Sequence, residues 1–340
     1  VLTKTVNGYI KRLPADTYNV QNRGGRGITG MTTREEDAVE NMFVCSSHDY
    51  IMLFSNLGRM YRIKAYEIPE GSRTSKGMNL INILPLLPDE KITVILPASE
   101  LDEDNYIAMV TKKGIIKRTK VSEFRNTRKS GIIAINIDDD DELGFVRMTN
   151  GKQNIFIATR DGLAIQFKEE GVRAMGRIAR CVKAINMREG DRVIDMAIVD
   201  EDSRILTVTE TGYGRISSIA DYRIQSRGGK GLTNYRTEKY GKVAATIPVT
   251  ENDDIIMIAS NGIVIRIFAG DISQFNRPAK GVRVMRVAEG EKILSVALTE
   301  HNEEEVTEKP EEADADAGDS EETAEEIALS NEAPLEDNEE

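Results

Sequence analysis

Two stretches of seven residues combine glycines with basic side chains in nearly the same order, QNRGGRG at 21–27 and QSRGGKG at 225–231. Adjacent glycines let backbone N–H groups approach an anion, and an arginine guanidinium can hold a phosphate through two parallel donors. Shorter stretches of the same kind are RTSKG at 73–77, TRKSG at 127–131, RIARC at 177–181 and RPAKG at 277–281. The chemistry that these residues indicate is the binding of phosphate groups.

We number these six stretches loops 1 to 6 in chain order. Any single loop of this kind is more often plain surface than a binding site, but six loops in phase favour binding. The glycine that ends five of the six is expected to serve a positive φ or a close approach of strands. The candidate binding residues are Gln21, Asn22, Arg23, Gly24, Gly25, Arg26, Gly27, Arg73, Lys76, Arg128, Lys129, Arg177, Arg180, Gln225, Arg227, Gly228, Gly229, Lys230, Gly231, Arg277 and Lys280.

The elements that must position these loops repeat about every 50 residues. A strand such as YIMLFS (50–55) or NIFIAT (154–159) precedes a glycine turn, and an apolar and basic strand follows it. Asn-Gly and Asp-Gly turns between apolar residues are strong hairpin signals. Six units of several strands, without a convincing amphipathic helix, predict an all-β fold of six propeller-like blades. The turn glycines are Gly8, Gly58, Gly114, Gly162, Gly212 and Gly262.

Basic residues also recur on the strand that follows each turn glycine. Equivalent positions in a radial array of blades lie at similar height, so we expect these residues to join the loops in a curved basic track. The strand ILSVAL at 293–298 follows the last unit, and we expect it to complete a blade with material from the other end of the chain. The basic strand residues are Lys11, Arg12, Arg59, Arg62, Lys117, Arg118, Arg215 and Arg266.

The charge of the chain is divided unevenly along its length. The 340 residues contain 45 Lys and Arg against 57 Asp and Glu, but 19 of the acidic residues and one lysine lie within 300–340. We therefore expect a mildly basic folded domain over 1–299 and a disordered acidic tail over 300–340. The tail is either a solubilising terminus or an electrostatic mimic of nucleic acid that contacts the basic rim. Because the chain begins without methionine in an expected strand, we expect a longer parent protein.

Motifs of enzymes are mostly absent. His48 and His301 are far apart, there is no phosphate-binding loop of the nucleotide-hydrolase type, and the acidic run 138–142 lacks the spacing of a calcium loop. We expect no catalytic residue, no metal site and no cofactor in this chain. Cys45 and Cys181 have no paired spacing, which favours a reducing cytoplasm, and no apolar run is long enough for a membrane span.

The composition also indicates which kind of nucleic acid would bind. Aromatic residues are 5% of the chain and tryptophan is absent, which argues against a binder of single strands that stacks on bases. The lack of a recognition helix argues against sequence reading in the major groove. Double-stranded DNA held by its backbone is the partner that fits best.

Residues 1–299 resemble the C-terminal domain of the DNA gyrase A subunit. Loop 1 is similar to the family's box, Q-R-R-G-G-[RK]-G, with Asn22 in place of an arginine. The resemblance implies a β-pinwheel in which neighbouring blades exchange strands and a basic rim wraps DNA. It implies a non-catalytic domain that presents a positively crossed segment to the cleavage core, so that strand passage introduces negative supercoils. The implied partners are the rest of the gyrase A subunit and the gyrase B subunit in the bacterial cytoplasm, at the nucleoid.

Two departures from the pattern weaken the fourth repeat, where Cys181 replaces the closing glycine and Gln166 replaces a basic residue. We expect that blade to contribute least to DNA contact. Three alternatives stay open. The C-terminal domain of the topoisomerase IV C subunit shares the blade design, but it usually has fewer blades and a degraded box. A propeller-type scaffold for protein interactions would leave the phased basic loops unexplained, and a propeller enzyme would need a central acid and base that the sequence lacks.

Overall fold

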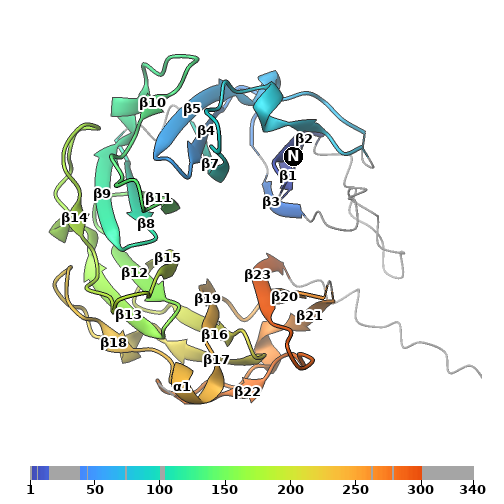
Figure 1. Ribbon diagram of the computed structural model, residues 1–340, viewed down its shortest axis with the longest axis vertical. Helices are drawn as coiled ribbons and strands as arrows, with labels where there is room; N and C mark the ends of the chain where they lie inside the picture. The colour runs from blue at the N-terminus through green and yellow to red at the C-terminus, as the bar shows by residue number, and fades with distance from the viewer. Residues whose placement is uncertain are drawn as a thin grey trace, which may run out of the picture. The chain divides into compact units, whose positions relative to one another are not determined.

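The structure is a computed structural model that describes residues 2–5, 7–14, 39–43, 45–72, 75–99, 104–261, 263–277 and 279–300. These residues belong to one compact unit, Val1–His301. They form six antiparallel sheets, which we call blades 1 to 6 in chain order (Figure 1). The α-helix of this part is a single turn, α1 (Thr237–Tyr240). The predicted all-β fold with six propeller-like blades is confirmed.

Each of the first five blades has the same strand order from its inner to its outer edge. Blade 1 is β3 (Val39–Phe43), β1 (Leu2–Thr5), β2 (Tyr9–Arg12) and β6 (Met78–Asn79). Blade 2 is β7 (Ile92–Ala98), β4 (Tyr50–Ser55), β5 (Arg59–Lys64) and β10 (Ile132–Ile133). Blade 3 is β11 (Leu143–Thr149), β8 (Tyr106–Thr111), β9 (Ile115–Lys120) and β14 (Val182–Lys183).

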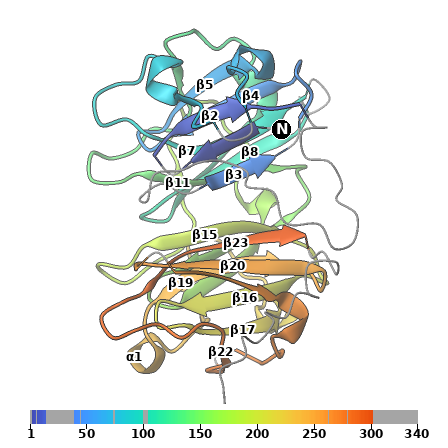
Figure 2. The same cartoon turned by 90° about the vertical axis from the view of Figure 1, so that its right-hand side faces the viewer.

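Blades 4 and 5 repeat this order, and blade 6 has three strands among the described residues. Blade 4 is β15 (Val193–Val199), β12 (Asn154–Thr159), β13 (Leu163–Lys168) and β18 (Leu232–Thr233). Blade 5 is β19 (Val243–Val249), β16 (Arg204–Thr209), β17 (Tyr213–Ser218) and β22 (Val282–Arg283), side by side in Figure 2. Blade 6 is β23 (Ile293–Glu300), β20 (Asp253–Ala259) and β21 (Val264–Phe268).

Neighbouring repeats exchange strands. The outer strand of each of blades 1 to 5 comes from the following repeat, as β22 of the sixth repeat does when it pairs with β17 in blade 5. The expectation for 293–298 was wrong, because β23 pairs with β20 of its own repeat and is the inner strand of blade 6. It is the equivalent of β19, whose neighbour in blade 5 is β16. A seven-to-eight-residue inner strand therefore ends each of the last five repeats.

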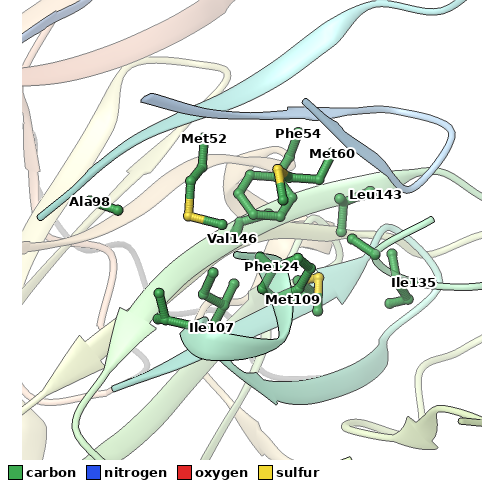
Figure 3. Packing of buried hydrophobic residues seen from close by; sticks show 12 residues of the cluster. Met52, Phe54, Met60, Ala98, Ile107, Met109, Phe124, Ile135, Leu143 and Val146 are labelled. Atoms are coloured by element: carbon green, nitrogen blue, oxygen red, sulfur yellow. The ribbon is translucent and has the colours of Figure 1, made fainter. Parts of the chain in front are cut away.

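The core lies between blades rather than at one centre. Five clusters of buried apolar side chains fill the five spaces between consecutive blades. Figure 3 shows the cluster between blades 2 and 3, where Phe54 and Phe124 meet edge-on with ring centroids 6.3 Å apart. Both faces of a middle strand are thus covered, which explains why YIMLFS reads as one apolar run instead of an alternating strand. Each fully buried Leu, Ile or Phe contributes about 1.5–3 kcal/mol.

The hairpins follow from local chemistry. In the first five hairpins a Thr or Ser three residues before the turn glycine accepts a hydrogen bond from the N–H just after it, as Thr209 Oγ1 does from Tyr213 at 3.1 Å. The sixth repeat has Ala259 at this position. The glycine itself has a φ of +86° at Gly212, where a Cβ atom would lie 2.1 Å from the carbonyl oxygen of Met285. A Thr-x-x-Gly pattern therefore fixes both the turn and the close approach of the neighbouring chain.

Candidate nucleic-acid interface

Each described basic loop lies on the blade before its own, next to the outer strand that it introduces. Loop 6 shows how: Gly281 has a φ of +74°, and a Cβ there would lie 2.2 Å from the carbonyl oxygen of Gly214 in β17. The expected role of the closing glycine is therefore confirmed. In loop 4 the same place holds Cys181, which does not adopt a positive φ, and whose thiol donates to the carbonyl of Asn136 at 3.7 Å. The outer strands β10, β14, β18 and β22 form the outer edge in Figure 1.

Solvent exposure divides the predicted loop residues into two groups. The exposed cations are Arg128 and Lys129 of loop 3, Arg180 of loop 4, Arg227 and Lys230 of loop 5, and Lys280 of loop 6. The half-buried ones are Lys76, Arg177 and Arg277. Among the neutral loop residues, Gln225 is half-buried with its side-chain Nε2 inside, while Gly228, Gly229 and Gly231 form the half-buried backbone of loop 5.

The first arginine of loops 5 and 6 is a tether between chain segments. Arg277 donates to the carbonyls of Asp221 at 2.8 Å and Thr233 at 2.6 Å. Arg227 makes the equivalent pair with Gly171 at 2.8 Å and Lys183 at 3.3 Å. These bonds use Nε and one terminal nitrogen of each guanidinium, and they fix the loop to the neighbouring chain. In loops 4 and 6 the second cation is the more exposed of the two.

Aromatic rings support the second cation at two loops. Lys280 Nζ lies 4.1 Å from the ring centroid of Tyr213, and Lys76 Nζ lies 3.6 Å from that of Tyr9, the equivalent residue of blade 1. Arg283 on β22 donates to the Tyr213 hydroxyl at 2.6 Å. The hydrogen bond from Arg283 and then that from Lys280 lower the pKa of the Tyr213 phenol. A cation held over a ring keeps a defined position while its outer side faces solvent.

The basic residues on the strands do not form one surface with the exposed cations of the loops. Lys11, Lys117 and Arg215 are 0% exposed, and Arg118 is buried against Glu169 with its nitrogen 3.0 Å from the carboxylate. The prediction that these four residues line a basic track was wrong. Gln166, which was expected to weaken blade 4, is also buried, so its substitution takes no charge from the surface.

The other four strand cations are held by neighbouring groups. Arg12 lies 3.4 Å from Glu70, Arg59 lies 3.6 Å from Glu90, and Arg266 lies 2.7 Å from Asp254. Arg62 stacks on Tyr50 with 3.4 Å between the guanidinium carbon and the ring centroid. These contacts make them parts of the blade framework.

The structure adds exposed cations that the sequence pattern had not indicated. Arg125, Arg173 and Arg223 each stand eleven residues after a turn glycine, two to four residues before loops 3, 4 and 5 begin, and all three are exposed. Lys183 and Arg283 are the exposed second residues of β14 and β22. The repeat phase was a signal for the first three, since the same count from Gly114, Gly162 and Gly212 leads to an arginine each time.

Several predictions concern residues outside those that the structure describes. Loop 1 with Gln21, Asn22, Arg23, Gly24, Gly25, Arg26 and Gly27 lies there, as do Arg73, Gly262 and residues 301–340 of the acidic tail. Within the described ranges, no group of three His, Cys, Asp or Glu side chains is placed to hold a metal ion. In the same part of the chain, no helix is long and apolar enough to cross a membrane.

Proteins similar in sequence to this chain include the DNA gyrase A subunits of several bacteria. The DNA gyrase A subunit of Clostridium acetobutylicum is 47% identical over 327 residues, which are 95% of this chain and 39% of that protein. The same subunit of Staphylococcus epidermidis is 44% identical over 301 residues, 87% of this chain and 34% of that protein. The chain therefore spans between a third and two fifths of the length of these relatives.

Solved structures of two related domains are similar in fold. The crystal structure of the C-terminal domain of DNA topoisomerase IV has a TM-score of 0.77 at 25% identity, covering 88% of this chain and 92% of that one. A DNA gyrase A C-terminal domain has a TM-score of 0.69 at 28% identity, covering 87% and 98%. The fold alone does not separate the two kinds of domain.

The repeats match a family model one by one. Residues 1–46, 49–99, 105–150, 153–200, 203–250 and 253–300 each match the model described as DNA gyrase C-terminal domain, beta-propeller. These six segments cover nearly the whole of residues 1–300, the part that forms the blades. The chain belongs to the DNA gyrase C-terminal domain family.

Proposed function

We propose that the chain binds double-stranded DNA by its phosphate backbone along the outer edge of the blades, and bends the duplex around that edge. The observation that carries the proposal is the set of exposed cations near the ends of successive loops. Arg180, Lys230 and Lys280 stand directly before the last residue of loops 4, 5 and 6, and Lys129 stands one position earlier in loop 3. Each such group that neutralises a phosphate releases counterions, which favours binding without reading the sequence. Several contacts in a curved row offset a bending cost of about 1–6 kcal/mol per 20–30 base pairs.

Loops 1 and 5 are the proposed anchors of this path. Loop 5 offers two adjacent glycines beside two exposed cations, Arg227 and Lys230, and loop 1 has the same residue pattern with Arg23 and Arg26. Backbone N–H groups next to glycine can approach a phosphate more closely than those next to a bulkier residue. The two loops would thus hold one bent duplex at separated points along its path.

We infer the role in the parent protein from the family to which the chain belongs. The wrapped DNA is presented as a positively crossed segment to a cleavage core in the rest of the gyrase A subunit, which acts with the gyrase B subunit to introduce negative supercoils. In this scheme residues 1–299 are a non-catalytic wrapping domain of a cytoplasmic, nucleoid-associated enzyme. Residues 300–340 are an acidic tail that competes with DNA for the basic edge.

The test is a topology measurement on nicked circular DNA. The 340-residue chain is incubated with the circle, the nick is ligated, and the linking number is compared with that of a ligation without protein. Positive wrapping predicts a shift to higher linking number that disappears as salt is raised, because phosphate contacts weaken with salt. An unchanged linking number together with absent or salt-independent DNA binding would refute the proposal.

The second candidate is the DNA-binding domain of a topoisomerase IV. The TM-score of 0.77 to the topoisomerase IV domain favours it, while the gyrase relatives at 44–47% identity favour wrapping in gyrase. The same assay separates the two ideas. Salt-dependent DNA binding without a linking-number shift would support a domain that holds DNA without wrapping it.

A further inference from the structure

Three buried cations occupy one repeated position in alternate blades. Lys11, Lys117 and Arg215 each stand three residues after the turn glycine, in blades 1, 3 and 5, and each is 0% exposed. Blades 2, 4 and 6 carry Tyr61, Ile165 and Ile265 at the same position. The fold therefore accepts an uncharged side chain here, and the cation needs a separate explanation.

Each cation donates to backbone carbonyls of the loop that the following repeat lays on its blade. Lys11 Nζ lies 3.2 Å from the oxygen of Ser72 and 3.0 Å from that of Ser75, which flank the start of loop 2. Lys117 Nζ donates to the carbonyl of Arg177 in loop 4 and, at 3.2 Å, to that of Ala134. Arg215 Nε donates to the carbonyl of Ala279 in loop 6 at 3.1 Å. A buried side chain of the blade thus donates hydrogen bonds to carbonyls in or beside loops 2, 4 and 6.

These cations are costly for the fold. In the described part of the chain, the hydrogen-bond partners of Lys117 are the two carbonyls, with no carboxylate in ion-pair contact. Burial lowers the pKa of the Lys117 ammonium, and the charge of Arg177 lowers it further. Because no carboxylate of the described residues pairs with Lys117, an apolar residue of similar size would remove the cost of burying a charge and leave no opposite charge unpaired, while the carbonyls of Arg177 and Ala134 would lose a donor. The stability of the blade is therefore a poor reason for keeping a lysine at this position.

Loop 5 shows the alternative arrangement. It lies over Ile165, whose Cδ1 would be 3.7 Å from a Cβ on Gly229, and among the described residues no side chain of β13 donates to its carbonyls. Its bonds come from the backbone and from Arg227 within the loop itself. The Gln225 N–H donates to Gln166 at 2.8 Å, the Asn186 N–H donates to Gly229 at 2.8 Å, and Arg227 donates to Gly171 and Lys183. The described loop with adjacent glycines thus lies on an isoleucine blade, while loops 4 and 6, which lack adjacent glycines, lie on cation blades.

We propose that Lys11, Lys117 and Arg215 are positioning residues for DNA binding. They hold the carbonyls of Ser72, Ser75, Arg177 and Ala279 in fixed positions, so that Lys76, Arg180 and Lys280 are in place before DNA arrives. Loop 5 has no such cation beneath it, and Arg227 of the loop itself bonds to the neighbouring chain. The proposal rests on the DNA-binding function proposed above, and it concerns the ordering of the loops. Pre-ordering removes an entropy cost from binding.

The test uses the 340-residue chain with Lys117→Met, the conservative Lys117→Arg, and Ile165→Met as the matched control in blade 4. Three quantities are measured: amide hydrogen exchange in residues 176–181, the thermal unfolding midpoint, and affinity for a linear duplex as a function of salt. For Lys117→Met we expect faster exchange in loop 4, a midpoint that is unchanged or higher, and roughly tenfold weaker DNA binding, the factor for ordering about one backbone residue. Lys117→Arg should restore both exchange and affinity, and Ile165→Met should change neither.

A residue that contacts phosphate directly should give a different result in these measurements. Arg180→Gln should leave exchange unchanged and reduce the slope of log affinity against log salt by about 0.9. Arg215→Met with Arg215→Lys repeats the experiment on loop 6, in case Lys117→Met does not fold. A lowered midpoint in step with lost affinity, or wild-type affinity in both methionine variants, would overturn the positioning role. If the wild-type chain binds no DNA, the proposed function fails, while exchange still shows whether the buried cation orders the loop.

Discussion

Asp195 is a buried carboxylate whose removal should stabilise the protein at neutral pH. It is 7% exposed on β15, and it lies 3.5 Å from the guanidinium of Arg147 on β11 of the neighbouring blade. Burial raises the pKa of Asp195 from 3.8 to about 6, against the opposing effects of Arg147 and of the hydrogen bond from the Met196 N–H. In the folded state this group therefore binds its proton more tightly than in the unfolded chain.

The sign of the pH dependence follows from that direction. Because the folded protein holds the proton more tightly than the unfolded chain, the favourable contribution is complete below pH 3.8 and is lost as pH rises to about 6 and beyond. A shift from 3.8 to about 6 corresponds to about 3 kcal/mol at 1.36 kcal/mol per pKa unit. Asp195→Asn keeps the acceptor for Met196 and removes the charge, so it should add up to about this much stability at pH 7.

The measurement is the free energy of unfolding in urea at several pH values from 4 to 8, for the wild type and for Asp195→Asn. The two should differ little near pH 4 and diverge as pH rises, with the variant more stable. Asp200→Asn, at an exposed carboxylate just past the end of the same strand, controls for the loss of one negative charge. The reasoning would be refuted if the free energies of unfolding of the two proteins changed with pH in parallel, or if the wild type became more stable relative to the variant as pH rises. Either result would mean that the ion pair with Arg147 offsets or outweighs the desolvation of Asp195.

Three further predictions concern the loops and the tail. Gly281→Ala should cost about 1–3 kcal/mol of backbone strain, in addition to the clash with Gly214, and lower the unfolding midpoint. Gly176→Ala, where no atom lies within 4 Å of the new Cβ, is its control. Neutralising Arg128 and Lys129 with glutamine should reduce the salt slope of DNA affinity by about 1.8, two phosphate contacts at about 0.9 each, and an unchanged slope would remove loop 3 from the interface. Truncation after residue 299 should strengthen DNA binding at low salt and have little effect at high salt, whereas equal affinities at low salt would make the tail a solubilising segment.

The repeat and its hairpins could be predicted because their causes are local. A hydroxyl residue, two turn residues and a glycine fix each of the first five hairpins within eight residues, whatever the rest of the chain does. The strands 50–55 and 154–159 accordingly have the predicted bounds. The sequence placed the outer strands only roughly. Strands such as β10 and β14 are two residues long, and they form only because a sheet of the neighbouring repeat has a free edge with which they can pair.

The sequence predicted where the loops of the candidate interface lie along the chain. It did not predict which of their basic residues face solvent and which bond within the protein. Loop cations such as Arg180 and Lys280 are exposed, while Arg277 is a tether and Lys117 lies inside. A strand alternates its side chains between two faces, and one sequence does not say which face a neighbouring loop will cover. The carbonyls that receive Lys117 and Arg215 come from residues 60 and 64 positions later.

The sequence by itself determined the six repeats, their hairpins and the phased basic loops, because these depend on neighbours within a few residues. Only the tertiary structure decided which cations face solvent and which bond to carbonyls. The physical reason is that a lysine or arginine is stable in either setting: water solvates it outside, and backbone carbonyls from the next repeat receive it inside. The choice between the two depends on where the exchanged strand places its loop.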